Sequence, residues 1–77
     1  MNSLEKLVYM ANQIAVNFGV LGEAEAISAI AGHIHDFWDP RMKSLIFAHL
    51  DAGGEGLNPV ARAALSRLAK DAGHIAA

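Results

Sequence analysis

The fold is decided by one segment, His33-Ile-His-Asp-Phe-Trp-Asp-Pro-Arg-Met-Lys-Ser-Leu-Ile-Phe-Ala-His-Leu-Asp-Ala-Gly-Gly-Glu-Gly-Leu-Asn-Pro59. It contains the only Trp of the chain, both prolines, three of the four histidines and three of the seven glycines. Asp39 before Pro40, and Asn58 before the second proline, each place a capping side chain ahead of a residue that needs no N–H partner in a first helical turn. The segment therefore predicts two helix starts separated by a glycine-rich turn.

Apolar residues recur at spacings of three and four on both sides of this segment, which is typical of helices that bury one face. No segment shows the alternation of a β-strand. The expected helices lie at about 3–18, 23–38, 40–51 and 59–72. We therefore predict a small all-α protein, one domain over residues 1–77, built as an antiparallel bundle or an orthogonal helical array.

The ends of the helices are marked as well. Asn2 and Glu5 have the spacing of a capping box at the start of the first helix. Gly19 and Gly73 follow the first and fourth helices, where a glycine with positive φ commonly ends a helix. We expect Gly19 to have that conformation and Gly73 to end the fourth helix.

The apolar stripes also predict the core. Ile34 and Phe37 of the second helix, and Leu45 and Ile46 of the third, are expected to be buried. Gly32 interrupts the second helix, and close approach of a neighbouring backbone would explain a glycine there. The fourth helix has a narrow, alanine-rich stripe, and we expect it to bury the least per residue.

Composition limits the function. Hydrophobic residues make up 53% of the 77 residues, and so small a domain leaves part of its apolar surface exposed, where partners usually bind. A net charge of −2 disfavours nucleic acid as a partner. No cysteine is present, which excludes disulfides and cysteine-ligated zinc or iron–sulfur clusters. No run has the length and hydropathy of a signal peptide or membrane span, so we expect a cytoplasmic protein without membrane contact.

Catalytic chemistry finds little support. His33, His35 and His49 are candidate metal ligands, but residues two apart on a helix point in different directions, and a hydrogen-bonded histidine is the ordinary explanation for His49. The turn from Gly53 to Gly56 lacks the lysine and the preceding strand of a phosphate loop. We therefore predict no catalytic, metal-binding or cofactor-binding residue.

A partner-binding surface is the better hypothesis. Two cations of the third helix, Arg41 and Lys43, lie in its first turn, where the helix dipole disfavours them; either Asp36 and Asp39 pair with them, or a partner does. Trp38 is either a core residue or a binding hot spot. The glycine-rich loop is expected to adapt to the partner. The predicted partner-binding residues are Trp38, Arg41, Met42, Lys43, Gly53, Gly54, Glu55, Gly56 and Leu57.

Four motifs point to a family: Met10-Ala-Asn-Gln-Ile-Ala, Phe37-Trp-Asp-Pro-Arg-Met, His49-Leu and Gly53-Gly-Glu-Gly-Leu. With them the chain resembles the delta subunit of soluble NAD-dependent formate dehydrogenase, over roughly Leu4 to Pro59. The Phe37-to-Met42 block is the most specific of the four.

The resemblance implies a non-catalytic subunit that supports the assembly, stability or activity of a formate-oxidising complex. The molybdopterin, iron–sulfur and flavin centres of that complex belong to its larger subunits, which are the partners that the resemblance implies. The alternative is a free-standing homodimeric helical adaptor or regulator, whose excess apolar surface would be self-complementary.

Overall fold

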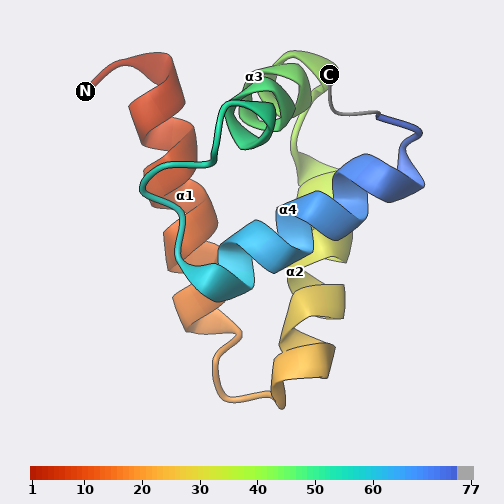
Figure 1. Cartoon of the computed structure of the whole chain (residues 1–77). Helices are drawn as coiled ribbons and strands as arrows, with labels where there is room; N and C mark the ends of the chain where they lie inside the picture. The colour runs from red at the N-terminus through yellow and green to blue at the C-terminus, as the bar shows by residue number, and fades with distance from the viewer. Residues whose placement is uncertain (75–77) are drawn as a thin grey trace.

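The computed structural model describes residues 1–74 and contains four α-helices. They are α1 (Ser3–Asn17), α2 (Glu23–Phe37), α3 (Pro40–Asp51) and α4 (Pro59–Asp71). In Figure 1, α1 and α2 run in opposite directions, α3 lies near the start of α1, and α4 passes across the other helices. The prediction of an all-α protein is confirmed. Helix α4 runs crosswise to α1 and α2 in Figure 1, so the arrangement resembles an orthogonal array more than an antiparallel bundle.

The predicted helix starts are present. Asn2 and Glu5 form the capping box: the Asn2 Oδ1 accepts from the Glu5 N–H at 2.8 Å, and the Glu5 carboxylate accepts from the Asn2 N–H at 3.1 Å. Asp39 and Asn58 each accept a hydrogen bond from the backbone N–H three residues later, at 2.9 and 2.8 Å. These caps satisfy N–H groups that a helix leaves without partners in its first turn.

The helix ends follow the prediction at one of the two glycines. Gly73 ends α4 with φ 79°, as expected, and Gly53 ends α3 in the same way with φ 116°. The prediction for Gly19 is wrong, because it is not among the residues with positive φ. Its N–H instead donates to the Val16 carbonyl at 3.0 Å, a tight turn that ends α1 without the left-handed conformation.

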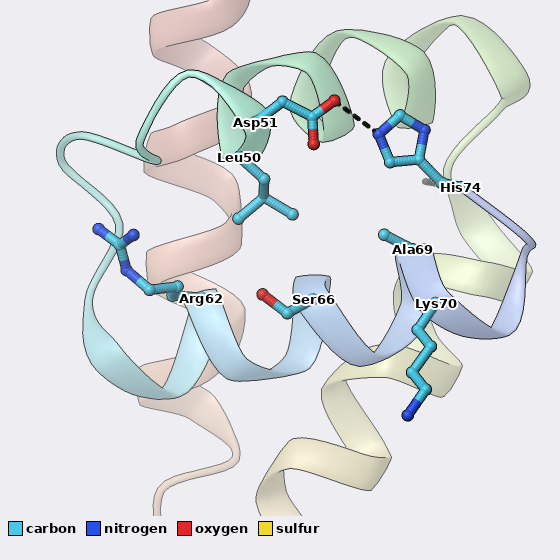
Figure 2. A pocket seen from close by; sticks show the side chains of 7 residues that line it. All are labelled: Leu50, Asp51, Arg62, Ser66, Ala69, Lys70 and His74. Atoms are coloured by element: carbon cyan, nitrogen blue, oxygen red, sulfur yellow. Dashed lines mark hydrogen bonds and ion pairs between the residues drawn. The ribbon is translucent and has the colours of Figure 1, made fainter. Parts of the chain in front are cut away.

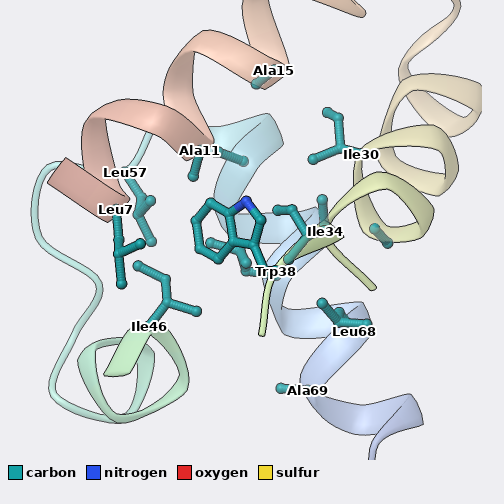
Figure 3. Packing of buried hydrophobic residues seen from close by; sticks show 14 of the residues in the cluster. Leu7, Ala11, Ala15, Ile30, Ile34, Trp38, Ile46, Leu57, Leu68 and Ala69 are labelled. Carbon is teal, nitrogen blue, oxygen red and sulfur yellow. The ribbon is translucent and has the colours of Figure 1, made fainter. Parts of the chain in front are cut away.

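Trp38 lies in the middle of the core, with 4% of its surface exposed. Figure 3 shows its indole surrounded by side chains from α1, α2, α3 and the loop before α4. Aromatic side chains of this size bury large areas and dominate core energetics. The fully buried large side chains are Ile30, Ile34, Ile46 and Leu65.

The prediction that α4 buries the least per residue is wrong. Five of its 13 residues are buried, more than in any other helix. Alanine is small, so the alanine-rich stripe lets the backbone of α4 approach its neighbours closely. The buried residues of α4 are Ala61, Ala64, Leu65, Leu68 and Ala69.

Three further expectations are wrong. Phe37 and Leu45 were expected in the core and are 73% and 38% exposed. A Cβ atom at Gly32 would meet nothing within 4 Å, so no neighbouring backbone requires glycine there. The apolar stripes of α2 and α3 are wider than the surface that the other helices cover, and these residues lie on the uncovered margin.

Candidate partner-binding surface

The structure divides the predicted partner-binding residues into buried and exposed groups. Trp38 and Leu57 are core residues, and Gly54 is buried as well. The core alternative therefore holds for Trp38, and its expected role as a surface hot spot is corrected. The exposed residues are Arg41, Gly53, Glu55 and Gly56.

Lys43 is used inside the molecule. Its Nζ donates a hydrogen bond to the His35 carbonyl at 2.8 Å. That carbonyl belongs to the last turn of α2, where the helix dipole favours a positive charge. Lys43 therefore compensates for its unfavourable place at the start of α3 by binding the end of α2, and the expected pairing with Asp36 or Asp39 is not what the structure shows.

Arg41 behaves differently. Its guanidinium makes no hydrogen bond or ion pair with any other residue of the described range 1–74. It lies beside a groove of about 260 Å³ between the start of α1 and the start of α3. The groove is lined by Ser3, Lys6, Leu7, Met10, Asp39, Arg41, Met42 and Leu45. An exposed cation beside apolar side chains is a suitable contact for an acidic group of another protein.

The glycine-rich loop is held in place from three sides. Every carbonyl oxygen from residue 53 to residue 56 accepts a hydrogen bond from a side chain. Arg62 donates to the carbonyls of residues 53 and 54, at 2.7 and 3.1 Å. His49 contacts the carbonyl of residue 55 at 2.7 Å, and Asn12 donates to that of residue 56 at 2.9 Å. The loop is thus held by α1, α3 and α4, and its adaptation to a partner stays a prediction.

Sequence reasoning missed Asn12 and Arg62. Asn12 also accepts a hydrogen bond from the Asn58 N–H at 2.9 Å, so it holds both the loop and the start of α4. Arg62 lies in the first turn of α4, where the dipole disfavours a cation, which is the same signal that singled out Arg41 and Lys43. Applied to α4, that signal would have found it.

Two of the histidines, His33 and His49, make contacts inside the chain. The predicted hydrogen bond of His49 is confirmed by its contact with the Glu55 carbonyl. The ring of His33 packs 4.8 Å from the ring of Phe37 and 6.1 Å from that of Phe18. Among the residues that the structure describes, no three His, Asp or Glu side chains come together as a metal site.

A second cavity lies between the ends of α3 and α4 (Figure 2). Its volume is about 300 Å³, and His74 and Asp51 bridge it with a 2.8 Å contact. Arg62 lines the cavity, but its guanidinium donates its hydrogen bonds to the loop carbonyls. The contact between His74 and Asp51 therefore connects the end of α4 to the end of α3.

Comparison with known proteins supplies the family. A family model described as NADH-dependent formate dehydrogenase delta subunit FdsD matches residues 6–65. No curated protein and no solved structure matches the chain. Within residues 1–74, no helix has the length and hydropathy needed to cross a membrane.

Proposed function

The chain belongs to the family of NADH-dependent formate dehydrogenase delta subunits, and we propose that it is a non-catalytic subunit of that enzyme complex in the cytoplasm. It supports assembly, stability or activity by binding the larger subunits. The observation that carries the proposal is the family match, which extends from the first turn of α1 into α4. In this proposal the redox centres lie in the larger subunits, and this chain supplies a binding surface.

The groove between α1 and α3 supports the proposal from the structure. Arg41 lies exposed at its edge, and Met42 and Leu45 provide apolar lining. Arginine is enriched among the residues that dominate binding energy at interfaces, because its planar guanidinium pairs with carboxylates and also packs against apolar groups. A larger subunit that places a carboxylate here would pair this cation.

Trp38 and Lys43 hold α3, the helix that carries Arg41, against the rest of the molecule. Trp38 fills the core below α3, and Lys43 ties the start of α3 to the end of α2. Such contacts fix the position of the start of α3, where Arg41 lies. Preformed surfaces bind more tightly, because less conformational entropy is lost on association.

Reversal of the Arg41 charge tests the proposal. The tagged chain is purified from its native cell, and the larger subunits that remain bound are measured by formate-dependent reduction of NAD⁺. Arg41→Glu should reduce the bound activity at least about tenfold. Unfolding does not explain such a loss, because the dipole of α3 favours a negative charge in the first turn by about 0.3–1 kcal/mol.

Arg67→Glu is the matched control. Arg67 is exposed on α4, and its contact with Asp71 is long, at 4.0 Å, so the change is equal in charge and placed elsewhere. Its bound activity should equal that of the unchanged chain. Equal retention by both variants would contradict the role of Arg41. A wild-type chain that sediments as a tight dimer and retains no larger subunit would favour the homodimeric adaptor instead.

A further inference from the structure

Several of the exposed apolar residues lie near one another. Phe37 contacts the ring of His33, which contacts Phe18 at the end of α1. On α1 the residues Met10, Ile14 and Phe18 are spaced by four, so they form one stripe along the helix. Met10 in turn shares the groove with Leu45 of α3. The strip thus connects three helices.

This strip lies away from α4. The flank of α2 that meets α4 carries Ser28, Ala31 and His35, which line a cavity together with residues of α4. His33 and Phe37 occupy the other flank of α2, beside α1. We call the surface made by Met10, Phe18, His33, Phe37 and Leu45 the α4-free face. Helix α4 packs against the opposite flank of α2 and leaves this face uncovered.

The exposure of this face is unusual for its residue types. Phe37 is 73% exposed and Met10 is 39% exposed. The His33 ring holds the phenyl ring of Phe37 on one side, at 4.8 Å between centroids, so the ring is exposed and also restrained. Restrained aromatic side chains lose little entropy on binding, and contiguous apolar patches mark interaction sites.

Charge at one edge of the face indicates what binds it. Lys6 and Arg41 line the groove that contains Met10 and Leu45. The third charged residue there, Asp39, already accepts a hydrogen bond from the Met42 N–H in the first turn of α3. The edge therefore offers positive charge to a partner, and a complementary partner presents carboxylates.

A second copy of this chain is a poor match. A two-fold dimer joins the same patch of both subunits, so each copy would offer the other its own cations. Near the face, Asp39 is engaged as a helix cap and Asp36 is paired with His35 at 3.0 Å. In such a dimer each copy would bring two cations, Lys6 and Arg41, against one carboxylate of the groove, Asp39.

We propose that the α4-free face binds one amphipathic helix of a larger subunit, with apolar side chains over Met10 and Phe37 and a carboxylate facing Lys6 and Arg41. The stripe from Met10 to Phe18 is about 12 Å long, which matches two to three turns of such a helix. In this arrangement the partner helix covers the side of α1 and α2 that α4 leaves open. The inference rests on the proposed function, and it names the partner surface.

Site-specific crosslinking within the intact complex tests it. Phe37 and, separately, Leu45 are replaced by p-benzoylphenylalanine, the complex is purified from the native cell and irradiated, and the linked peptides are identified by mass. Both positions should link to one segment of one larger subunit, with an acidic residue nearer the Leu45 link. Tyr9 and Val16 are control positions, since both are exposed on α1 but off the Met10–Phe18 stripe.

Each other outcome overturns the inference. Links from Phe37 to a second copy of the chain would show a homodimer face. Links only from Tyr9 or Val16 to the larger subunits would place the interface elsewhere while leaving the proposed function intact. If the unmodified chain retains no larger subunit, the proposed function fails together with the inference.

A substitution pair gives an independent measure. Phe37→Ala should lower the apparent affinity for the larger subunits at least about tenfold, whereas Tyr9→Ala should leave it unchanged. Both side chains are exposed aromatics, so the pair is matched in type. Equal affinity of both variants would contradict the proposal, provided that thermal unfolding shows both to be folded.

Discussion

The glycine-rich loop and the α4-free face differ in how their groups are satisfied. In the loop, each of the four carbonyl oxygens from residue 53 to residue 56 accepts a side-chain hydrogen bond. On the face, Phe37 lies 73% exposed. At the edge of the face, the Arg41 guanidinium makes no hydrogen bond or ion pair within residues 1–74. The polar groups of the loop find their partners inside the chain, and the exposed groups of the face do not.

The difference separates two reasons for an unusual residue. The glycines of the loop are required by backbone geometry, since Gly54 has φ 65° and packs against the Arg62 guanidinium. Phe37 meets no such requirement inside the chain. A residue that the fold does not explain is the better candidate for contact with a partner.

The largest effect should come from two neighbouring aromatic residues. Trp38 is buried in the core, whereas Phe37 is exposed on the α4-free face. Trp38→Ala should lower the free energy of unfolding by about 3–5 kcal/mol, because it empties the centre of the core. A chain of this size has roughly 4–12 kcal/mol in total, so much of the protein should unfold. Urea denaturation followed by circular dichroism measures the change. Phe37→Ala, the control, should stay within about 0.5 kcal/mol of wild type; similar losses in both variants would contradict the assignment.

A smaller loss is expected at the loop. Gly54→Ala should destabilise the protein by about 1–2 kcal/mol from the left-handed backbone conformation alone. Its new Cβ would also lie 3.0 Å from the Arg62 Nη1, so the two hydrogen bonds of that arginine are disturbed. Gly32→Ala is the control, because Gly32 is not among the residues with positive φ and a Cβ there meets nothing within 4 Å. Unfolding curves of both variants measure this loss. An unchanged free energy of unfolding in the Gly54 variant would show that the loop is not tightly held.

Asn12→Ala tests the same loop from the side of α1. It removes the donor to the Gly56 carbonyl and the acceptor for the Asn58 N–H, and the expected loss is about 1 kcal/mol. Amide exchange at Asn58 should accelerate in parallel. The neighbouring exposed Gln13→Ala should change neither quantity, and slow exchange at Asn58 in the Asn12 variant would argue against the bridge.

The smallest effect should be a gain. Gly32→Ala should raise the free energy of unfolding by about 0.5–1 kcal/mol, because alanine is the better helix residue and open space surrounds this position. Thermal unfolding measures it. Destabilisation would mean that a neighbour packs against Gly32 after all.

The sequence predicts what is local and misses what depends on packing. The caps at Asn2, Asp39 and Asn58 act within three residues, so their signals stand in the sequence itself. The exposure of Phe37 and Leu45 depends on which flank of their helices α4 covers, and no local pattern encodes that. The same limit holds for Trp38, which the sequence left as either a core residue or a binding hot spot. It also holds for Arg41, which the sequence left as paired either with Asp36 and Asp39 or with a partner.

Contacts between distant residues explain the rest of the misses. Asn12 binds Gly56 and Asn58, which lie 44 and 46 residues later. Before the chain has folded, nothing in the polar flank of α1 distinguishes Asn12 from Gln13. Only the dipole argument could have drawn attention to Arg62.

The bridge made by Asn12 also bears on the order of events in folding. Asn58 caps α4 with its side chain while its own N–H is held by Asn12, so the start of the last helix is completed by the first. Bringing residues 46 positions apart together costs loop-closure entropy that local helix contacts do not. We expect α4 to become stable only once α1 is in place, which makes the first and last helices one cooperative unit despite their separation in the chain.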